Sequence, residues 1–197
     1  MMAQGGGGGL IPSEDGVYIQ SIDNKFYTYD EWNLPNEQAN GVAVISSEHP
    51  DGGFVIAKTE SVRKTWGMTS ISVSGIVTTN DINTAKEDLK GFYNTYSIIS
   101  QDSYANAAIY CNEHVFPNGN AGYLPSVGEL VIAYKSKVKI ENCLLKIGSI
   151  SIKTDDGYWS STQVSLDSAW IFDFNNSNLE QTIKYFNRYC IPFTTLK

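Results

Sequence analysis

The polar side chains in the last third of the chain have the types that molecular recognition requires. Amides, carboxylates, an ammonium and a phenol follow one another there, and such a mixture combines adaptable hydrogen bonding with rigid contact area. A loop that is merely solvated has the same composition, so both interpretations stay open. The candidate ligand-binding residues are Gln163, Asp167, Asn175, Asn176, Asn178, Gln181, Lys184, Tyr185 and Asn187.

Metal binding has little support in the same region. Asp155, Asp156, Asp167 and Asp173 could gather locally. Calcium takes six or more oxygen ligands, however, and these four residues lack the spacing of a preformed site. We therefore interpret the acidic residues as parts of solvated loops, and we predict no metal ion and no cofactor.

The cysteines indicate packing rather than chemistry. Cys111, Cys143 and Cys190 are far apart in the sequence, and a metal site needs closer spacing and more ligands. The chain begins with Met-Met-Ala-Gln and five glycines, without the basic and apolar regions of a cleavable signal peptide. We therefore expect reduced, packed thiols instead of disulfides.

Nucleophilic catalysis is not indicated either. His49 precedes a turn proline and His114 follows a predicted helix, and we expect both histidines at the surface. A Ser-His-Asp arrangement around Ser160 or Ser161 therefore has little support, and these serines are expected to close a turn or bond the backbone. The N-terminal glycines lack the preceding strand and the following Lys-Ser/Thr of a phosphate loop. We predict that the chain is not an enzyme.

Composition restricts the class of partner. The formal net charge is -7, which argues against nucleic acid because phosphate binding needs a positive field. No apolar run is long enough to span a bilayer, so no membrane insertion is expected. A hydrophobic content of 42% is sufficient for a packed core, and 197 residues suffice for one good-sized domain.

The elements that must position these residues begin with strands. Residues 1–13 form a glycine-rich lead, which is either a flexible tail or an anchor that orders within an assembly. Turn residues such as His49-Pro-Asp-Gly-Gly53 separate the short strands that follow and indicate antiparallel pairing. The predicted strands are residues 17–20, 25–28, 41–46 and 54–57.

Helices follow, and then the chain returns to strands. Ser126 and Glu129 form a capping box at the start of the most clearly predicted helix. Trp159 and Trp170 lie in aromatic strands and are expected in the core. The predicted helices are residues 84–90, with Gly91 ending the first of them, 103–111, 126–135 and 140–147. The later predicted strands are residues 157–159, 169–174 and 188–191.

Several of these segments resemble a known fold family. Tyr123-Leu-Pro-Ser-Val-Gly-Glu-Leu130, Tyr158-Trp-Ser-Ser-Thr-Gln163, Ala169-Trp170, Asp173-Phe174 and Arg188 resemble a bacterial and phage branch of the C-type lectin fold. That branch includes retroelement-diversified receptor-binding proteins, common in gut Bacteroides and their phages, and the fold also holds the formylglycine-generating enzymes. The resemblance covers about residues 105–191.

The resemblance implies an α+β, C-type lectin-like fold. Two helices would flank a small twisted antiparallel sheet, preceded by a short β-rich region, and ligands would bind on the loops and late strands between Gln163 and Asn187. The Glu-Pro-Asn or Gln-Pro-Asp loop and the Trp-Asn-Asp strand of the calcium-dependent lectins are missing. The implied divisions are a tail at 1–13, a β-rich region at 14–80 and a C-type lectin-like domain at 81–197.

The resulting functional hypothesis is a non-enzymatic phage virion protein, such as a tail or head fibre or a decoration protein. It would bind a host-surface protein or glycan and contact other virion proteins through its glycine-rich N-terminus, and we expect a homo-oligomer, with a trimer favoured. The alternatives are a purely structural virion component, a bacterial surface lectin or adhesin, and a degenerate enzyme of the formylglycine-generating type. The expected location is the virion, assembled in the host cytoplasm, or alternatively the bacterial cell surface.

Overall fold

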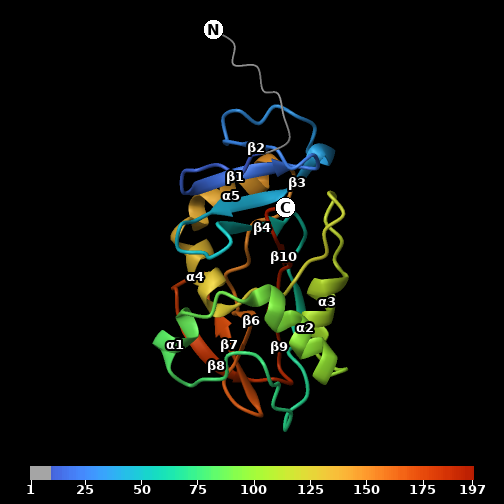
Figure 1. Ribbon diagram of the computed structural model, residues 1–197, viewed down its shortest axis with the longest axis vertical. Helices are drawn as coiled ribbons and strands as arrows, with labels where there is room; N and C mark the ends of the chain where they lie inside the picture. The colour runs from blue at the N-terminus through green and yellow to red at the C-terminus, as the bar shows by residue number, and fades with distance from the viewer. Residues whose placement is uncertain (1–9) are drawn as a thin grey trace.

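The computed structural model describes residues 10–197, which form two five-stranded sheets and five α-helices. The molecule is elongated, with one sheet at one end and the second sheet, accompanied by α1, α2 and α3, at the other (Figure 1). The predicted α+β class is confirmed. Most of the glycine-rich lead, residues 1–9, lies outside the described residues.

The first sheet, called sheet A, contains the early strands and the last one. Its order is β10-β4-β3-β1-β2, and every neighbouring pair is antiparallel. The four early strands were predicted from turn chemistry, and their existence is confirmed. They are β1 (Gly16–Ser21), β2 (Phe26–Tyr27), β3 (Ala39–Ile45) and β4 (Gly53–Ala57), and the sheet is completed by β10 (Phe193–Thr194).

The second sheet, sheet B, has the order β5-β9-β6-β7-β8. Its pairs are antiparallel except for β6 and β9, which pair in parallel at Tyr158 and Tyr189. The expectation of a purely antiparallel sheet was therefore wrong in this detail. The strands are β5 (Val62–Thr65), β6 (Tyr158–Gln163), β7 (Ser168–Phe172), β8 (Leu179–Ile183) and β9 (Asn187–Cys190).

Strand pairing links the two ends of the molecule. Strand β5 comes from the early part of the chain and pairs with β9 in sheet B, whereas β10 comes from the end and pairs with β4 in sheet A. The chain therefore crosses from sheet A to sheet B between β4 and β5, and returns from sheet B to sheet A between β9 and β10. The division into residues 14–80 and 81–197 stays a prediction, as does the finer C-type lectin-like assignment.

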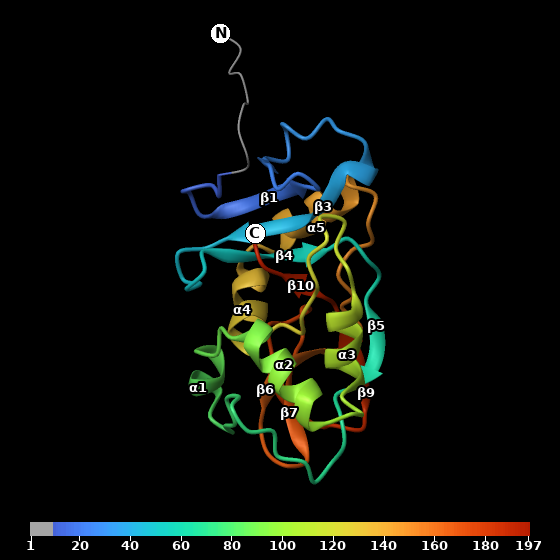
Figure 2. The ribbon, with the colours of Figure 1, turned by 45° about the vertical axis from the view of Figure 1, so that its right-hand side comes forward.

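The helices pack on both sheets. Helix α4 (Val127–Lys135) contacts β6 and β7, and α5 (Lys137–Lys146) contacts β1 and β3, so the two consecutive helices connect sheet B with sheet A. Helix α2 (Gly91–Gln101) contacts β6, and α3 (Asn106–Glu113) contacts β5 (Figure 2). Helix α1 (Ile82–Lys86) lies against α4. No helix in residues 10–197 has the length and apolar character needed to cross a membrane.

Two of these helices test the predictions. Helix α4 begins with the predicted capping box, in which the Ser126 backbone amide donates to Glu129 Oε2 at 2.7 Å. Helix α2 was missed, because Gly91 begins this helix instead of ending the one before it. Its aromatic and β-branched residues favour helix weakly, so packing on β6 decides its conformation.

The hydrophobic core joins both sheets. The larger cluster places Val42 and Phe54 of sheet A and Phe172 of sheet B in one set with residues of α4 and α5. A second cluster centred on Trp66 and Trp159 lies beneath α2 and α3. Trp159 is fully buried and Trp170 is 3% exposed, which confirms their predicted core positions.

Candidate functional site

The nine predicted site residues divide into buried and exposed sets. Gln163 and Lys184 are fully buried, and the Lys184 ammonium donates a 2.8 Å hydrogen bond to Gln163 Oε1. These two side chains therefore lie beneath the surface and support it from inside. The exposed residues are Asp167, Asn175, Asn176, Asn178, Gln181, Tyr185 and Asn187.

Three predicted site residues hold the long loop between β5 and α1, residues 66–81. Lys184 Nζ donates to the carbonyl of Ile71 at 2.7 Å. Gln163 Oε1 accepts a hydrogen bond from the Val73 amide at 3.2 Å, and Asp167 Oδ1 accepts one from the Ser70 amide at 2.8 Å. These contacts could not be predicted from local sequence, because the partners lie about a hundred residues earlier in the chain.

Lys184 has an unusual environment for a charged group. Its ammonium lies 4.5 Å from the centre of the Trp66 ring, a cation–π contact that partly offsets the loss of water. Burial lowers the pKa of Lys184 to about 8, and the charges of Asp102 and Asp167 act in the opposite direction. This lysine is therefore a structural cation with a shifted protonation equilibrium.

Three of the four asparagines of the predicted surface lie in the turn between β7 and β8, and the fourth, Asn187, begins β9. The backbone amide of Asn175 donates to Asp173 Oδ1 at 2.7 Å, and the backbone amide of Asn178 donates to Asn176 Oδ1 at 3.0 Å. These bonds are within the turn, which leaves the side-chain amide of Asn175 available to a ligand. Gln181 on β8 donates to the carbonyl of Asn80 at 3.2 Å, so it too supports the 66–81 loop.

An acidic cavity of about 280 Å³ lies beside this turn. Asp156 forms ion pairs with Arg63 and Arg188, and Asp155 lies 3.4 Å from Arg63. Within residues 10–197, no group of three or more His, Cys, Asp or Glu side chains is placed to hold a metal ion. The lining residues are Thr154, Asp155, Asp156, Gly157, Ile171, Asp173, Asn175, Glu180 and Arg188.

A separate cavity of about 310 Å³ contains Tyr185. Tyr104, from the turn between α2 and α3, also lines it and was missed by sequence reasoning. The nine predicted residues are therefore not gathered in one pocket, since Asn175 and Tyr185 line different cavities. The full lining is Thr65, Gly67, Met68, Thr69, Tyr104, Asn106 and Tyr185.

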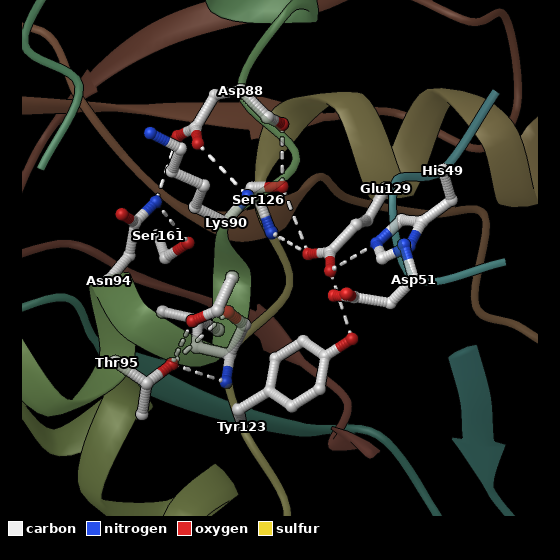
Figure 3. A network of polar contacts seen from close by, with 12 residues as sticks. His49, Asp51, Asp88, Lys90, Asn94, Thr95, Tyr123, Ser126, Glu129 and Ser161 are labelled. Carbon is white, nitrogen blue, oxygen red and sulfur yellow. Dashed lines mark hydrogen bonds and ion pairs between the residues drawn. The ribbon is translucent and has the colours of Figure 1, made fainter. Parts of the chain in front are cut away.

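A buried polar network surrounds the start of α4 (Figure 3). Glu129 Oε1 accepts a hydrogen bond from the Tyr123 hydroxyl at 2.9 Å and lies 3.3 Å from His49 Nε2. The prediction of a surface position for His49 was wrong, because its side chain is 4% exposed and faces Glu129. His49 Nδ1 accepts from the Asp51 amide at 3.2 Å, which places the proton of a neutral ring on Nε2, facing Glu129.

The network continues through Asp88. Its carboxylate accepts hydrogen bonds from Thr162 Oγ1 at 2.7 Å and Asn94 Nδ2 at 2.9 Å. Burial raises the pKa of Asp88, and the hydrogen bonds from Thr162 and Asn94 partly oppose that rise. With Asp88 and Glu129 at most 2% exposed, we interpret the network as a device that fixes the start of α4 rather than a ligand site.

The cysteines and serines have structural roles. All three cysteines are buried and free, as predicted, and the Cys190 thiol donates to the Val62 carbonyl at 3.3 Å. Burial raises the pKa of the Cys143 thiol to about 11, which makes it a poor nucleophile at neutral pH. Ser160 Oγ donates to the Trp170 carbonyl at 2.9 Å, consistent with the expected bond to the backbone.

Comparison with known proteins shows a similarity in fold to a solved structure. No protein-family model and no curated protein matches the sequence. The crystal structure of a fimbrial protein from Bacteroides ovatus is similar to this chain, with a TM-score of 0.70 and 16% sequence identity. The similarity covers 91% of this chain but 48% of the other, so the chain spans about half the length of that protein. The chain therefore shares the fold of part of a bacterial fimbrial protein.

Proposed function

We propose that this chain is a non-enzymatic protein of the bacterial cell surface, acting as a structural or adhesive component of a fimbria-like assembly. The observation that carries the proposal is the fold similarity to the fimbrial protein over 91% of the chain. The proposal retains a C-type lectin-like arrangement for residues 81–197, as the scaffold that presents the late loops.

The exposed residues between Asp167 and Asn187 support the adhesive part of the proposal. Amide, carboxylate and phenol groups lie at the surface there, on a scaffold fixed by Lys184 and Gln163. Rigid support beneath adaptable polar groups lowers the conformational cost of binding. The proposed partner is a host-surface protein or a glycan. Alternatively, the same loops form the subunit contacts of a homo-oligomer, with a trimer favoured.

Locating the protein tests the proposal directly. We expect labelled antibody to reach it on intact cells of the encoding organism and to detect it in sheared surface fibres. A protein found only in the cytoplasm would contradict the proposal. Detection in purified phage particles would instead support the virion hypothesis, which comes from the sequence resemblance to the phage branch of the C-type lectin fold.

A matched pair of triple variants tests adhesion. Replacing Asn176, Gln181 and Tyr185 with alanine should reduce attachment to host cells while surface display is retained. The control replaces exposed residues of the same types near sheet A, and it should attach like the wild type. Equal attachment by both variants would rule out the late loops as the adhesive surface. The control residues are Asn33, Gln38 and Tyr29.

A further inference from the structure

The cavity that contains Tyr185 has an unusual combination of exposed aromatic rings and neutral polar groups. Tyr104 is 61% exposed, Tyr185 55% and Met68 46%. Asn106, Thr65 and Thr69 supply amide and hydroxyl groups, and none of the lining residues is charged. The volume of about 310 Å³ is at the lower end of the range for small-ligand pockets.

One buried carboxylate fixes two parts of this cavity. Asp102 is 1% exposed. Its Oδ2 atom accepts a hydrogen bond from the Met68 amide at 2.8 Å, and its Oδ1 atom accepts one from the Tyr104 amide at 2.8 Å. Gly67 is required beside it, because a Cβ at that position would overlap Asp102 Oδ2. The relative positions of Met68 and Tyr104 are therefore set before any ligand arrives.

The residue before Tyr185 fixes the other part. The Lys184 carbonyl accepts a hydrogen bond from the Trp66 amide at 2.8 Å, and the Lys184 ammonium lies against the Trp66 ring. Tyr185 thus follows a residue that is anchored through both its backbone and its side chain. Asp102 and Lys184 are buried residues that hold an uncharged, exposed rim in place, and supporting hydrogen bonds of this kind preorganise a binding site.

We infer that this cavity binds a neutral sugar ring, so that Tyr104 and Tyr185 are the aromatic contacts of a glycan-binding site. The C–H hydrogens of a sugar ring carry a slight positive charge and are attracted to the negative face of an aromatic ring. Asn106 Nδ2 donates to Thr65 Oγ1 at 2.8 Å, which leaves the amide oxygen, the second amide hydrogen and the Thr65 hydroxyl hydrogen for sugar hydroxyls.

The lining also argues against charged ligands. Phosphate, sulfate or carboxylate groups would need a lysine or arginine in the cavity, and a cationic ligand would need a carboxylate. The lining has neither, and the net charge of -7 repels polyanions. The inference rests on the proposed adhesive function, for which it names the ligand class.

The test is a titration of isotope-labelled protein with methyl glycosides of glucose, galactose, mannose, fucose and N-acetylglucosamine, followed by NMR. At least one is expected to shift the backbone signals of Gly67, Met68 and Tyr104. Tyr104→Ala and Tyr185→Ala should each weaken that binding about tenfold or more, which corresponds to about 1.4 kcal/mol. Tyr104→Phe and Tyr185→Phe should keep the affinity within about threefold, since the ring faces remain.

Tyr93→Ala is the matched control, because Tyr93 is a 66% exposed tyrosine of α2 that lines a different cavity. It should bind like the wild type. The inference is overturned if none of the five glycosides binds, if the alanine variants bind normally while their melting curves match the wild type, or if sialic acid or glucosamine binds more tightly than every neutral sugar. If no sugar binds but the protein is found on the cell surface, the sugar inference is wrong and the proposed function stands. If a sugar binds but the protein is absent from the cell surface, the proposed function is wrong and the sugar site stands.

Discussion

Lys184 and Trp66 form a buried cation–π pair, with the ammonium 4.5 Å from the ring centre and both side chains fully buried. The ammonium also donates to the Ile71 carbonyl and to Gln163 Oε1. A neutral amine keeps two N–H donors, so it can make both bonds after losing a proton. The two hydrogen bonds therefore survive deprotonation, although the cation–π attraction does not, and burial makes deprotonation easier.

This environment predicts a pH-dependent contribution to stability. Burial lowers the pKa of Lys184 from 10.5 to about 8. Between these two values the unfolded chain binds more protons than the folded protein, so the free energy of unfolding contributed by Lys184 rises with pH from about 8 to 10.5. Below pH 8 both states carry the proton and the contribution is constant.

Urea denaturation of the wild type and of Lys184→Met at pH 7, 8, 9 and 10 measures this contribution. The stability difference between the two proteins should change in favour of the wild type across the upper part of the range. Lys135→Met, which removes an exposed lysine paired with Glu48, serves as the control and should keep the wild-type profile. A constant difference between wild type and Lys184→Met would contradict the prediction.

The positions of Lys184, Gln163 and His49 show what the sequence could not reveal. Each is a polar residue in a segment that reads as loop or strand end, where exposure is the usual outcome. Each becomes buried because a distant segment supplies its partners, as Glu129 does for His49 and the 66–81 loop does for Lys184 and Gln163. The residues next to each of these positions in the sequence do not indicate such distant partners.

A second prediction concerns the carboxylate beneath the proposed sugar site. Asp102→Asn keeps the size of the side chain but turns one acceptor oxygen into an N–H₂ donor facing the amide of Met68 or Tyr104. We expect a loss of about 1–3 kcal/mol in the free energy of unfolding. Weaker binding of the best neutral glycoside should accompany it.

Asp102 acts by positioning, so its two effects should be separable. Gln101→Ala, next in sequence but bonded to Ser74 at the surface, provides the comparison. It should reduce stability less and leave sugar affinity unchanged. Normal sugar affinity in Asp102→Asn, measured well below its melting temperature, would exclude a positioning role for Asp102.

The helices show where local signals suffice. Helix α4 was predicted because its capping box and apolar face are encoded within ten residues. Helix α2 was not, because Gly91 at its start resembles a helix end and its stability comes from packing on β6. Strands β5, β8 and β10 were also missed. Strand β8 is largely exposed and β10 has only two residues, so the local sequence signal of these two strands is weak.

A third prediction concerns the buried network at α4. Tyr123→Phe removes one of the donors to Glu129 and should cost about 1 kcal/mol. Glu129→Gln should cost more, about 2–3 kcal/mol, because the amide places a donor against the Ser126 amide or against Tyr123 and His49. Both changes in the free energy of unfolding are measured by urea denaturation, as shifts of the transition midpoint in variants that keep the wild-type dependence on urea concentration.

Glu141→Gln is the control for this pair of variants. Glu141 is a partly exposed carboxylate of α5 lying 4.0 Å from Lys137, and such pairs contribute about 0.5 kcal/mol or less. The three values should therefore increase in the order Glu141→Gln, Tyr123→Phe, Glu129→Gln. If Glu129→Gln were no worse than Glu141→Gln, the buried network would not stabilise α4.

The final prediction sets helix propensity against packing at Gly91. Alanine in a helix is favoured over glycine by about 1 kcal/mol, so Gly91→Ala considered locally should stabilise α2. A Cβ at Gly91, however, would overlap Glu129 Oε2 and lie 2.8 Å from Tyr123 Cε2 and 2.9 Å from the Ser126 nitrogen. These groups belong to a fully bonded network and have little freedom to move.

We therefore expect Gly91→Ala to lower the free energy of unfolding, by about 1–3 kcal/mol net of the propensity gain. Ser100→Ala, at an exposed position of the same helix, isolates the propensity effect and should be neutral or slightly stabilising. Denaturation of both variants in urea gives the comparison. A Gly91→Ala protein as stable as Ser100→Ala would mean that the start of α2 does not pack against the capping box, and the close approach of Gly91 to Glu129 would lose its structural meaning.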